Sequence, residues 1–474
     1  MSEADLIVVG GGPAGVEAAI EAARHGLAVT LMDEAPEAGG QVYRATPRAF
    51  SGELVRKADP TGVGLRDRLR ESRAITLFDH TVWSVSPGFR VDALSPEGPV
   101  SRKAPAVIAA SGAQERVVPF PGWTRPEVVG LAAATIMLKS QGILPGQLTL
   151  LAGQGPLLLA VAIGILKAGG RVAAIIDLAS RSEWLADWPA LASRPDLALR
   201  GFLWQAKLRN AGVPILYRHA IRLVEEVAEG QVQVTVGPVA ANGAALDDID
   251  RIFQVDAVAV GNGLTASTDI TRLLRATHHF EALRGGWVPT LDAEYRSSVP
   301  GLYVAGDGAG LAGAAAAACD GRLAGLVAAR DLGALSQQAY ETAAAPLRRS
   351  AARARRFGTA MARLMALRPA QVEAIPPETV LCRCEDVTRA DITAAAAEGA
   401  RTLNQLKAWT RCGMGPCQGR ICGDVIGAAL AAEGCSREQA GYFTGRTPFR
   451  PLPLDQLAGT VAYADLKLPP PAPV

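Results

Sequence analysis

The sequence predicts an α/β protein with two Rossmann-like nucleotide-binding units and a small, α-rich C-terminal domain. Three observations lead to this prediction. A strand, a glycine-rich turn, a helix and a second strand follow one another at the start of the chain, and the same order returns from residue 147. Six of the seven cysteines lie in the last quarter of the sequence. The chain of 474 residues is long enough for several domains of roughly 100–200 residues each.

The first unit begins with an apolar run over residues 5–9, which is typical of a buried parallel strand. Gly10, Gly12 and Gly15 follow at the G-x-G-x-x-G spacing and open a helical pattern. In this motif the first glycine makes the tight turn, the second lets a pyrophosphate approach the backbone, and the third lets the helix pack closely on the strand. Asp33 ends the next apolar run, 23 residues after Gly10, where an acid binds a ribose hydroxyl. The pattern therefore predicts a dinucleotide site.

The composition is that of an ordinary globular protein, with 49% hydrophobic and 20% charged residues. The net charge is +2, from 48 basic and 46 acidic residues, so we expect no nucleic-acid partner and no binding to a membrane surface. The apolar run 148–166 is long enough for a membrane helix, but the glycine turn at 153–156 interrupts it, so we expect no stable membrane insertion. Because the N-terminus shows no signal-peptide pattern, we expect a cytoplasmic protein.

The second unit repeats the pattern with one departure. Its turn keeps Gly153 and Gly155, but Leu158 stands where the third glycine is expected, and this side chain should hold the helix away from the strand. Asp177 ends the following strand 24 residues after Gly153, and an acid at this position favours NAD over NADP. Two interpretations stay open: the unit binds a nucleotide such as NAD, or it serves as a scaffold.

Three further motifs resemble those of flavoproteins with two dinucleotide-binding domains, the glutathione-reductase type. A Gly-Gly pair at 39–40 lies where the chain of such proteins passes close to the flavin. The strand over 105–110 ends in Ser111-Gly112, similar to their A-T-G turn, and the strand over 301–305 ends in Gly306-Asp307, where their aspartate binds the ribityl chain. The resemblance implies FAD as the cofactor. The residues expected to contact it are Gly10, Gly12, Pro13, Ala14, Gly15, Asp33, Glu34, Gly40, Gln41, Arg44, Val82, Ser111, Gly112, Gly306 and Asp307.

These motifs predict the domain organisation. A discontinuous FAD-binding domain covers residues 1–115 and 285–335, and a second dinucleotide-binding-like domain at 116–284 is inserted in it. An arginine-rich helical stretch at 336–375 is expected to be a solvated linker. Two consecutive prolines open a separate domain at 376–450, and the proline-rich residues 451–474 are expected to form an extended tail.

Five cysteines of the C-terminal domain have the spacing of metal ligands. Cys382 and Cys384 form a C-x-C pair, and Cys412, Cys417 and Cys422 follow. No histidine occurs between residues 376 and 450, so a Cys₂His₂ zinc site is excluded, and four thiolates must bind either zinc or an iron–sulfur cluster. Structural zinc in all-cysteine sites uses C-x₂₋₄-C pairs, so the C-x-C pair favours a [2Fe–2S] cluster. The second pair of ligands is either Cys417 with Cys422 or Cys412 with Cys417.

The C-terminal cysteines resemble those of bacterioferritin-associated ferredoxins. In that type of domain the loop between the two cysteine pairs has a length similar to the 32 residues between Cys384 and Cys417, whereas only 27 residues separate Cys384 from Cys412. The resemblance implies Cys382, Cys384, Cys417 and Cys422 as the ligands of a [2Fe–2S] cluster in the domain at 376–450. Cys412 is then expected to have no role in metal binding.

The combination of flavin motifs and C-terminal cysteines resembles the alpha subunit, with FAD and [2Fe–2S], of heteromeric bacterial amino-acid dehydrogenases. This group includes octopine and nopaline oxidases, D-hydroxyproline dehydrogenase and the B subunit of hydrogen cyanide synthase. The resemblance implies a D-amino-acid-oxidase-like flavoprotein beta subunit that oxidises the substrate. In part of the group it also implies an FMN at the interface between subunits and a small ferredoxin-like gamma subunit. Relatives such as the sarcosine oxidase alpha chain bind NAD in the second unit, and Leu158 argues against NAD in this chain.

The sequence therefore predicts an electron-transfer flavoprotein subunit with no catalytic residue of its own, which takes part in the oxidation of an amino acid or opine at a C–N bond. A disulfide reductase needs a pair of cysteines beside the flavin, but no cysteine precedes Cys319. The five histidines show no general-base motif. Two alternatives stay open: a self-contained NAD(P)H-dependent FAD and iron–sulfur oxidoreductase, and a non-catalytic scaffold subunit.

Overall fold

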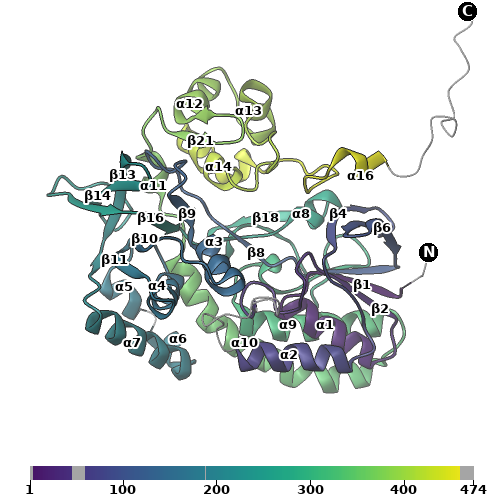
Figure 1. Ribbon diagram of the computed structural model, residues 1–474. Coiled ribbons are helices and arrows are strands. Elements are labelled where there is room, and N and C mark those ends of the chain that lie inside the picture. Colours follow the sequence, from purple (N-terminus) through teal and green to yellow (C-terminus); the bar gives the residue numbers. More distant parts are fainter. Residues whose placement is uncertain (1–3, 45–58, 187, 459–474) are drawn as a thin grey trace, which may run out of the picture.

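The computed structural model describes residues 4–44, 59–186 and 188–458. Two α/β units lie side by side, and a small helical domain lies over the junction between them (Figure 1). Across the three described ranges, the structure contains no helix with the length and apolar character needed to cross a membrane.

The first unit is built on a parallel five-stranded sheet with the order β20-β7-β1-β2-β3. Its strands are β1 (Leu6–Val9), β2 (Val29–Met32), β3 (Ile75–Leu77), β7 (Ala106–Ala109) and β20 (Leu302–Val304). Every residue of β1, β2, β7 and β20 is buried, as expected for parallel strands that are covered on both faces. Because the strands are parallel, their carboxyl ends lie at one edge of the sheet, where ligands bind in folds of this class.

Two helices cross closely on one face of this sheet. They are α1 (Pro13–Arg24) and α9 (Ala314–Asp331), and α2 (Pro60–Glu71) lies beside them (Figure 1). A Cβ at Gly321 of α9 would lie 1.9 Å from the carbonyl oxygen of Ala14, so only glycine permits this approach. The crossing holds the 3₁₀ turn Gly306–Ala309, which precedes α9, near the start of α1.

The other face of the sheet is covered by short antiparallel elements. They are the sheet of β4 (Thr81–Ser86), β5 (Arg90–Ser95) and β6 (Gly98–Lys103), the pair β8 (Ala113–Glu115) with β17 (Leu264–Ala266), the helix α8 (Asp269–Leu273), the pair β18 (His278–Glu281) with β19 (Gly286–Pro289), and the 3₁₀ turn Ala282–Arg284. Ile270, Leu274 and Ala276 belong to the same core as Val9 and Met32. Residues 264–284, which the sequence placed in the second unit, thus pack with the first.

The second unit repeats the parallel sheet, with the order β12-β11-β10-β16-β9. Its strands are β9 (Val128–Gly130), β10 (Leu148–Gly153), β11 (Arg171–Asp177), β12 (Ile215–Tyr217) and β16 (Ala257–Gly261). The helices are α3 (Leu131–Ile136) with a π-helical extension (Met137–Gln141), α4 (Leu157–Lys167), α5 (Arg181–Ala186), α6 (Trp188–Ala192) and α7 (Pro195–Asn210), and the antiparallel strands are β13 (His219–Ala228), β14 (Gln231–Pro238) and β15 (Arg251–Val255). Leu158 is buried between α4 and the sheet, where it is a packing residue of this core.

The predicted helical stretch is present as the long helix α10 (Gln337–Leu364). One side of it is buried against both units, so the prediction that it is solvated is wrong. Its first half contributes Tyr340, Ala344, Leu347 and Ala351 to the core of the first unit, and its last turns pack against Ala179 of the second unit. Alanines interleave with the arginines along the helix, and several of them lie on its buried side with the larger apolar residues. The charged residues that suggested solvation lie on the other side or form ion pairs, as Arg355 does with the buried Asp320 (2.6 Å).

The C-terminal domain is small and mostly helical. It contains α11 (Pro369–Glu373), β21 (Val380–Cys382), β22 (Val387–Thr388), α12 (Arg389–Ala397), α13 (Leu403–Thr410), α14 (Gly423–Ala432) and α15 (Arg437–Ala440). Thr388, Thr402 and Ser436 each begin a helix with a capping box, in which side chains satisfy the free N–H groups at the helix start. Local sequence therefore determines where these short helices begin.

The chain leaves this domain and returns to the first unit. Phe449 is buried in the core beside β4, and its N–H donates to the carbonyl of Trp83 (2.9 Å). A short helix, α16 (Leu454–Ala458), follows near β6. The prediction of an extended tail is therefore wrong over these residues, and residues 459–474 lie outside the described ranges.

Candidate functional site

The carboxyl edge of the first sheet brings together the segments that the sequence assigned to FAD. The N–H of Gly10 donates to the carbonyl of Met32 at the end of β2 (2.8 Å), and that of Ala110 donates to Val9 at the end of β1 (2.8 Å). The N–H of Ala305 donates to Ala109 at the end of β7 (3.1 Å). These hydrogen bonds place the glycine turn, the serine turn and the Gly-Asp turn side by side.

The glycine turn has open space at its middle glycine. A Cβ at Gly10, whose φ is +111°, would lie 2.3 Å from the Ala110 carbonyl oxygen, and one at Gly15 would lie 1.8 Å from the carbonyl oxygen of Gly10. At Gly12 the nearest atom would be the Cα of Gly40, at 3.9 Å. Gly12 also caps α1 without a side-chain hydrogen bond, so the N–H groups of the first helical turn are left for a ligand. This arrangement fits a pyrophosphate, with Pro13 and Ala14 in the first turn.

Of the two adjacent acids after β2, the structure holds Asp33 beside the glycine turn. Its carboxylate accepts hydrogen bonds from the N–H groups of Gly11 and Ala35 (2.7 Å for Ala35). Burial raises the pKa of Asp33 above its usual value, against the effect of these hydrogen bonds. Glu34 is exposed. Asp33 is therefore the acid positioned to accept from a ribose hydroxyl.

The loop at 38–44 lies against the glycine turn. The N–H of Gly39 donates to the carbonyl of Gly11 (2.8 Å), and a Cβ at Gly40, whose φ is +56°, would lie 2.8 Å from the Cα of Gly12. Gln41 is exposed. Arg44 has a buried Nε with no hydrogen-bond partner among the described residues. An unsatisfied guanidinium nitrogen close to Asp33 and the turn is suited to an anionic ligand.

Arg66 of α2 holds this loop, and the sequence reasoning missed it. The guanidinium is buried and donates to the carbonyls of Ala38 and Tyr43, each at 3.1 Å. Because arginines on helices are mostly solvated, no local pattern distinguishes Arg66 from Arg68 or Arg70. Only the folded loop identifies it as a positioning residue.

We expect Arg66→Met to weaken FAD binding about five- to thirtyfold, because two hydrogen bonds that fix the loop are lost, at about 1–2 kcal/mol. The measurement is titration of the FAD-free protein with FAD, followed by flavin fluorescence. Arg70→Met on the exposed side of the same helix is the matched control and should bind FAD like the wild type. Equal affinities for both variants would contradict the role of Arg66.

The Gly-Asp turn is built around one carboxylate oxygen. Oδ1 of Asp307 accepts from the N–H groups of Ala312 (2.8 Å) and Gly313 (2.9 Å), which orders the segment before α9. A Cβ at Gly306 would lie 2.8 Å from the Cβ of Ala14, so the turn touches the first turn of α1. Asp307 is thus fixed near the glycine turn.

The serine turn and Val82 occupy different parts of the site. The hydroxyl of Ser111 donates to the carbonyl of Ser267 (2.7 Å), and the N–H of Ser267 donates to the carbonyl of Gly112 (3.0 Å). No heavy atom would lie within 4 Å of a Cβ at Gly112. The Val82 side chain is buried in the core beneath β4, so only its backbone is available to a cofactor.

In the second unit the glycine turn is covered by the protein itself. A Cβ at Gly155, the position that corresponds to Gly12, would lie 2.7 Å from the Cγ of Met365, directly after α10. Nε2 of Gln154 donates to the carbonyl of Ala366 (3.1 Å), and Arg116 donates to the carbonyl of Met365 (2.9 Å). The segment that follows α10 therefore occupies the space above this turn.

The acid of the second unit is also engaged. Asp177 accepts hydrogen bonds from the N–H of Ala179 and from Nε1 of Trp184, each at 2.9 Å. Burial raises the pKa of Asp177 to about 6. The glycine turn and the acid, which favoured a nucleotide in the sequence, are thus both in contact with other residues of the chain.

The four cysteines implied as cluster ligands meet where two segments cross. Cys382 ends β21 and Cys384 follows it by two residues, while Cys417 and Cys422 lie in the loop that precedes α14. The thiol of Cys422 contacts those of Cys382 and Cys417, and the thiol of Cys384 contacts that of Cys417. Over the ranges that the structure describes, no three Cys, His, Asp or Glu side chains are arranged to bind a single metal ion. The thiols are instead arranged as contacting pairs.

The pKa is lowered for two of these thiols, whereas burial raises that of Cys384 and the contacts with Cys382 and Cys417 raise that of Cys422. Hydrogen bonds from Cys422 lower the pKa of Cys382 to about 6 and that of Cys417 to about 5. Cys412 is fully buried in the domain core, and burial raises its pKa to about 11. Cys412 differs from the buried Cys422 in its contacts, because its thiol is hydrogen-bonded to Thr410, whereas that of Cys422 contacts two other cysteines.

Arg116 joins the three parts of the protein and carries no sequence signal. Its Nε donates to Asp424 of α14 (2.7 Å), while Nη1 donates to Met365. Asp424 also pairs with Arg437 (2.6 Å). Burial favours the neutral acid, but Arg116 and Arg437 hold the pKa of Asp424 below its usual value. This buried charge network fixes the cysteine domain against the first unit.

Comparisons with known proteins agree with this architecture. Residues 4–333 match the family model of pyridine nucleotide-disulphide oxidoreductases, and residues 378–460 match the sarcosine oxidase A3 domain. The opine oxidase A subunit of Agrobacterium tumefaciens (strain Ach5) is 33% identical, covering 96% of this chain and 91% of its own length. Hydrogen cyanide synthase subunit HcnB of Pseudomonas aeruginosa is 34% identical, covering 96% of this chain and 99% of its own. The crystal structure of L-proline dehydrogenase from P. horikoshii has a TM-score of 0.66 at 18% identity, covering 96% of this chain and 79% of that chain, which shows a shared fold.

Proposed function

Because this chain belongs to the family of the opine oxidase A subunit and hydrogen cyanide synthase subunit HcnB, and is an FAD-dependent oxidoreductase subunit, we propose that it transfers electrons in a heteromeric dehydrogenase that oxidises the C–N bond of an amino acid or opine. The observation that carries the proposal is the pairing of a flavin edge with a cysteine quartet in one chain. No cysteine precedes Cys319, so disulfide chemistry beside the flavin has no thiol to use.

The residues of the first unit fit FAD. Gly12 and the first turn of α1 would bind the pyrophosphate, Asp33 the adenosine ribose, and Asp307 the ribityl chain, while Arg44 would supply a positive charge. When bound, the flavin supplies a carrier for electrons. The protein contributes binding and orientation, and Arg66 keeps the loop at 38–44 in place.

Cys382, Cys384, Cys417 and Cys422 would bind a [2Fe–2S] cluster. The contacts among the four thiols support them as one set of ligands, and the lowered pKa values of Cys382 and Cys417 favour thiolates at these two positions. The network of Arg116, Asp424 and Arg437 would keep the cluster domain at a fixed place relative to the flavin.

The proposed complex contains a D-amino-acid-oxidase-like flavoprotein beta subunit, which oxidises the substrate, and the proposal extends to an FMN at the interface between subunits and to a small ferredoxin-like gamma subunit. Large apolar side chains are exposed on α5, α6 and α7, as is typical of surfaces covered by a partner: Leu185, Trp188, Leu199, Phe202 and Leu203.

The test is co-expression with the partner subunits, followed by a screen of amino acids and opines. Substrate should reduce the flavin in the complex, and reduction of the isolated chain by substrate would contradict the proposal.

The alternative of a self-contained NAD(P)H-dependent oxidoreductase is disfavoured by Met365, which covers the glycine turn of the second unit. We expect that neither NADH nor NADPH bleaches the flavin of the purified chain within minutes, whereas dithionite reduces it fully. Absorbance at the flavin maximum under anaerobic conditions measures this. Rapid bleaching by NADH would establish the alternative. A colourless, iron-free protein would instead favour a scaffold subunit.

A further inference from the structure

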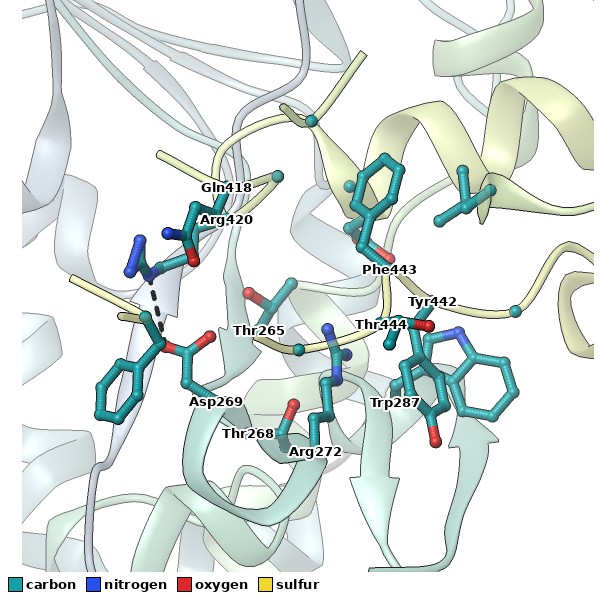
Figure 2. A pocket seen from close by; sticks show the side chains of 18 of the residues that line it. Thr265, Thr268, Asp269, Arg272, Trp287, Gln418, Arg420, Tyr442, Phe443 and Thr444 are labelled. Atoms are coloured by element: carbon teal, nitrogen blue, oxygen red, sulfur yellow. Dashed lines mark hydrogen bonds and ion pairs between the residues drawn. The ribbon is translucent and has the colours of Figure 1, made fainter. Parts of the chain in front are cut away.

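A cavity of about 260 Å³ lies between the first unit and the cysteine domain (Figure 2). Its first wall comes from β17, α8 and β19, including Thr265, Arg272 and Trp287. The opposite wall comes from the cysteine loop and the segment after α15, including Arg420 and Tyr442. The cavity adjoins the serine turn on one side, because β17 pairs with β8, and it adjoins Cys417 on the other through Gln418.

Three hydrogen-bond donors around this cavity are buried and lack an acceptor. They are Nε of Arg272, Nη2 of Arg420 and Nε1 of Trp287, for none of which the described part of the chain provides a partner. Figure 2 shows that Arg272 comes from α8, whereas Arg420 comes from the loop of the opposite domain. A buried polar atom without a partner carries a desolvation cost, so three donors around one space indicate a ligand rich in acceptors.

The charges around the cavity also favour an anion. Asp424 is held by Arg116 (2.7 Å) and Arg437 (2.6 Å), and Asp269 pairs with Arg420 (3.3 Å). Both acids of the lining are thus already neutralised by arginines. The guanidinium of Arg272 lies over the ring of Tyr442, 4.7 Å from its centroid, and its Nε has no acceptor among the described residues. Lys407 adds a further cation to the lining.

We propose that this cavity binds a small organic anion, a carboxylate or a phosphate monoester, with its charged group on Arg272 and Arg420. The rings of Trp287 and Tyr442, 4.9 Å apart, together with Phe443 and Phe449, form the apolar part of the wall. The volume lies just below the range of about 300–1,000 Å³ that is typical of small-molecule sites, so the organic part is small. None of the donors is among the residues assigned to FAD or the cluster, but Arg420 lies in the loop between Cys417 and Cys422 and donates to the carbonyl of Cys417 (3.0 Å).

The test is isothermal titration of the purified full-length chain with inorganic phosphate and, separately, with acetate, in a chloride buffer. We expect saturable binding that Arg272→Met weakens at least tenfold and Arg272→Lys partly restores, since a charge-assisted hydrogen bond is lost and then replaced. Trp287→Phe removes one donor but keeps an aromatic ring, and should weaken binding about two- to tenfold. Tighter phosphate binding identifies a phosphate monoester as the ligand, and tighter acetate binding identifies a carboxylate.

Arg24→Met, at the exposed end of α1, is the matched control and should bind both anions like the wild type. Melting temperature, FAD content and iron content of each variant report folding separately, and Trp287→Phe carries the test if Arg272→Met does not fold. Absence of saturable binding of both anions, or unchanged affinity in the folded variants, would overturn the proposal. Because binding is measured without electron flow, a chain that binds phosphate but lacks FAD or iron would contradict only the proposed function.

Discussion

Replacing Cys422 with serine is expected to remove the iron from the purified protein, whereas Cys412→Ser should retain about two irons per chain. Both cysteines are buried in the same small domain, so the two variants are matched in burial and in chemical change. Cys422 contacts the thiols of Cys382 and Cys417, which places it at the centre of the quartet. Cys412 is packed in the same core, but its thiol is hydrogen-bonded to Thr410 and not to another cysteine. The difference should therefore lie in metal binding and not in folding.

Iron analysis and the visible spectrum measure this difference, and the electron paramagnetic resonance signal of the reduced protein identifies the cluster type. Each variant should keep its FAD, because the cysteine domain and the flavin edge are built from separate cores. Loss of iron in Cys412→Ser together with retention in Cys422→Ser would reverse the ligand assignment. If the wild-type protein contains zinc and no iron, the four cysteines form a structural zinc site and the proposal of a cluster is wrong.

Gly12→Val is expected to abolish stable FAD binding, with an affinity loss of at least about a hundredfold, or about 3 kcal/mol. Gly12 has φ −73° and ψ −178°, an extended conformation that valine adopts without strain. A Cβ at this position would meet only the Cα of Gly40, at 3.9 Å, so the folded chain has room for a β-carbon. The valine would instead fill the space where the pyrophosphate must approach the backbone.

Gly64→Val is the matched control, because a Cβ at Gly64 of α2 would have no heavy atom within 4 Å. The measurements are the FAD content of the purified protein and the affinity of the FAD-free form for added FAD. Circular dichroism and iron content report whether the fold persists. Stoichiometric FAD in Gly12→Val would show that the phosphates bind elsewhere. Loss of iron as well as FAD would show that the two centres fold together.

Local sequence was sufficient to locate the segments that form the flavin edge. The spacing of Gly10, Gly12 and Gly15 predicts a strand, a turn and a helix. A Cβ at Gly10 would clash with the residue that follows the neighbouring strand, and a Cβ at Gly15 would clash with the turn itself. Asp33 follows at the end of the next strand, and the structure places it on the N–H of Gly11. Such features are encoded in short segments, so a pattern in the sequence identifies them.

The errors arose where a residue's environment comes from distant parts of the chain. The arginine-rich composition of α10 suggested a solvated linker, yet its alanine side is buried against both units. The proline-rich composition of the tail suggested an extended chain, yet α16 forms over Leu454–Ala458. Composition reports the average polarity of a segment, whereas burial depends on which side of a helix meets another element.

By itself, the sequence determined the two Rossmann-like units and located the glycine, Asp33 and Asp307 turns that meet at one edge of the first sheet, because these depend on local backbone geometry. The cluster ligands that it suggested stay a prediction. Only the tertiary structure decided that Met365 covers the second glycine turn, that Arg66 holds the flavin loop, and that Arg272 and Arg420 face one cavity. Each of these is a contact between segments far apart in the chain, and no local pattern specifies which distant side chain will fill or leave open a given space.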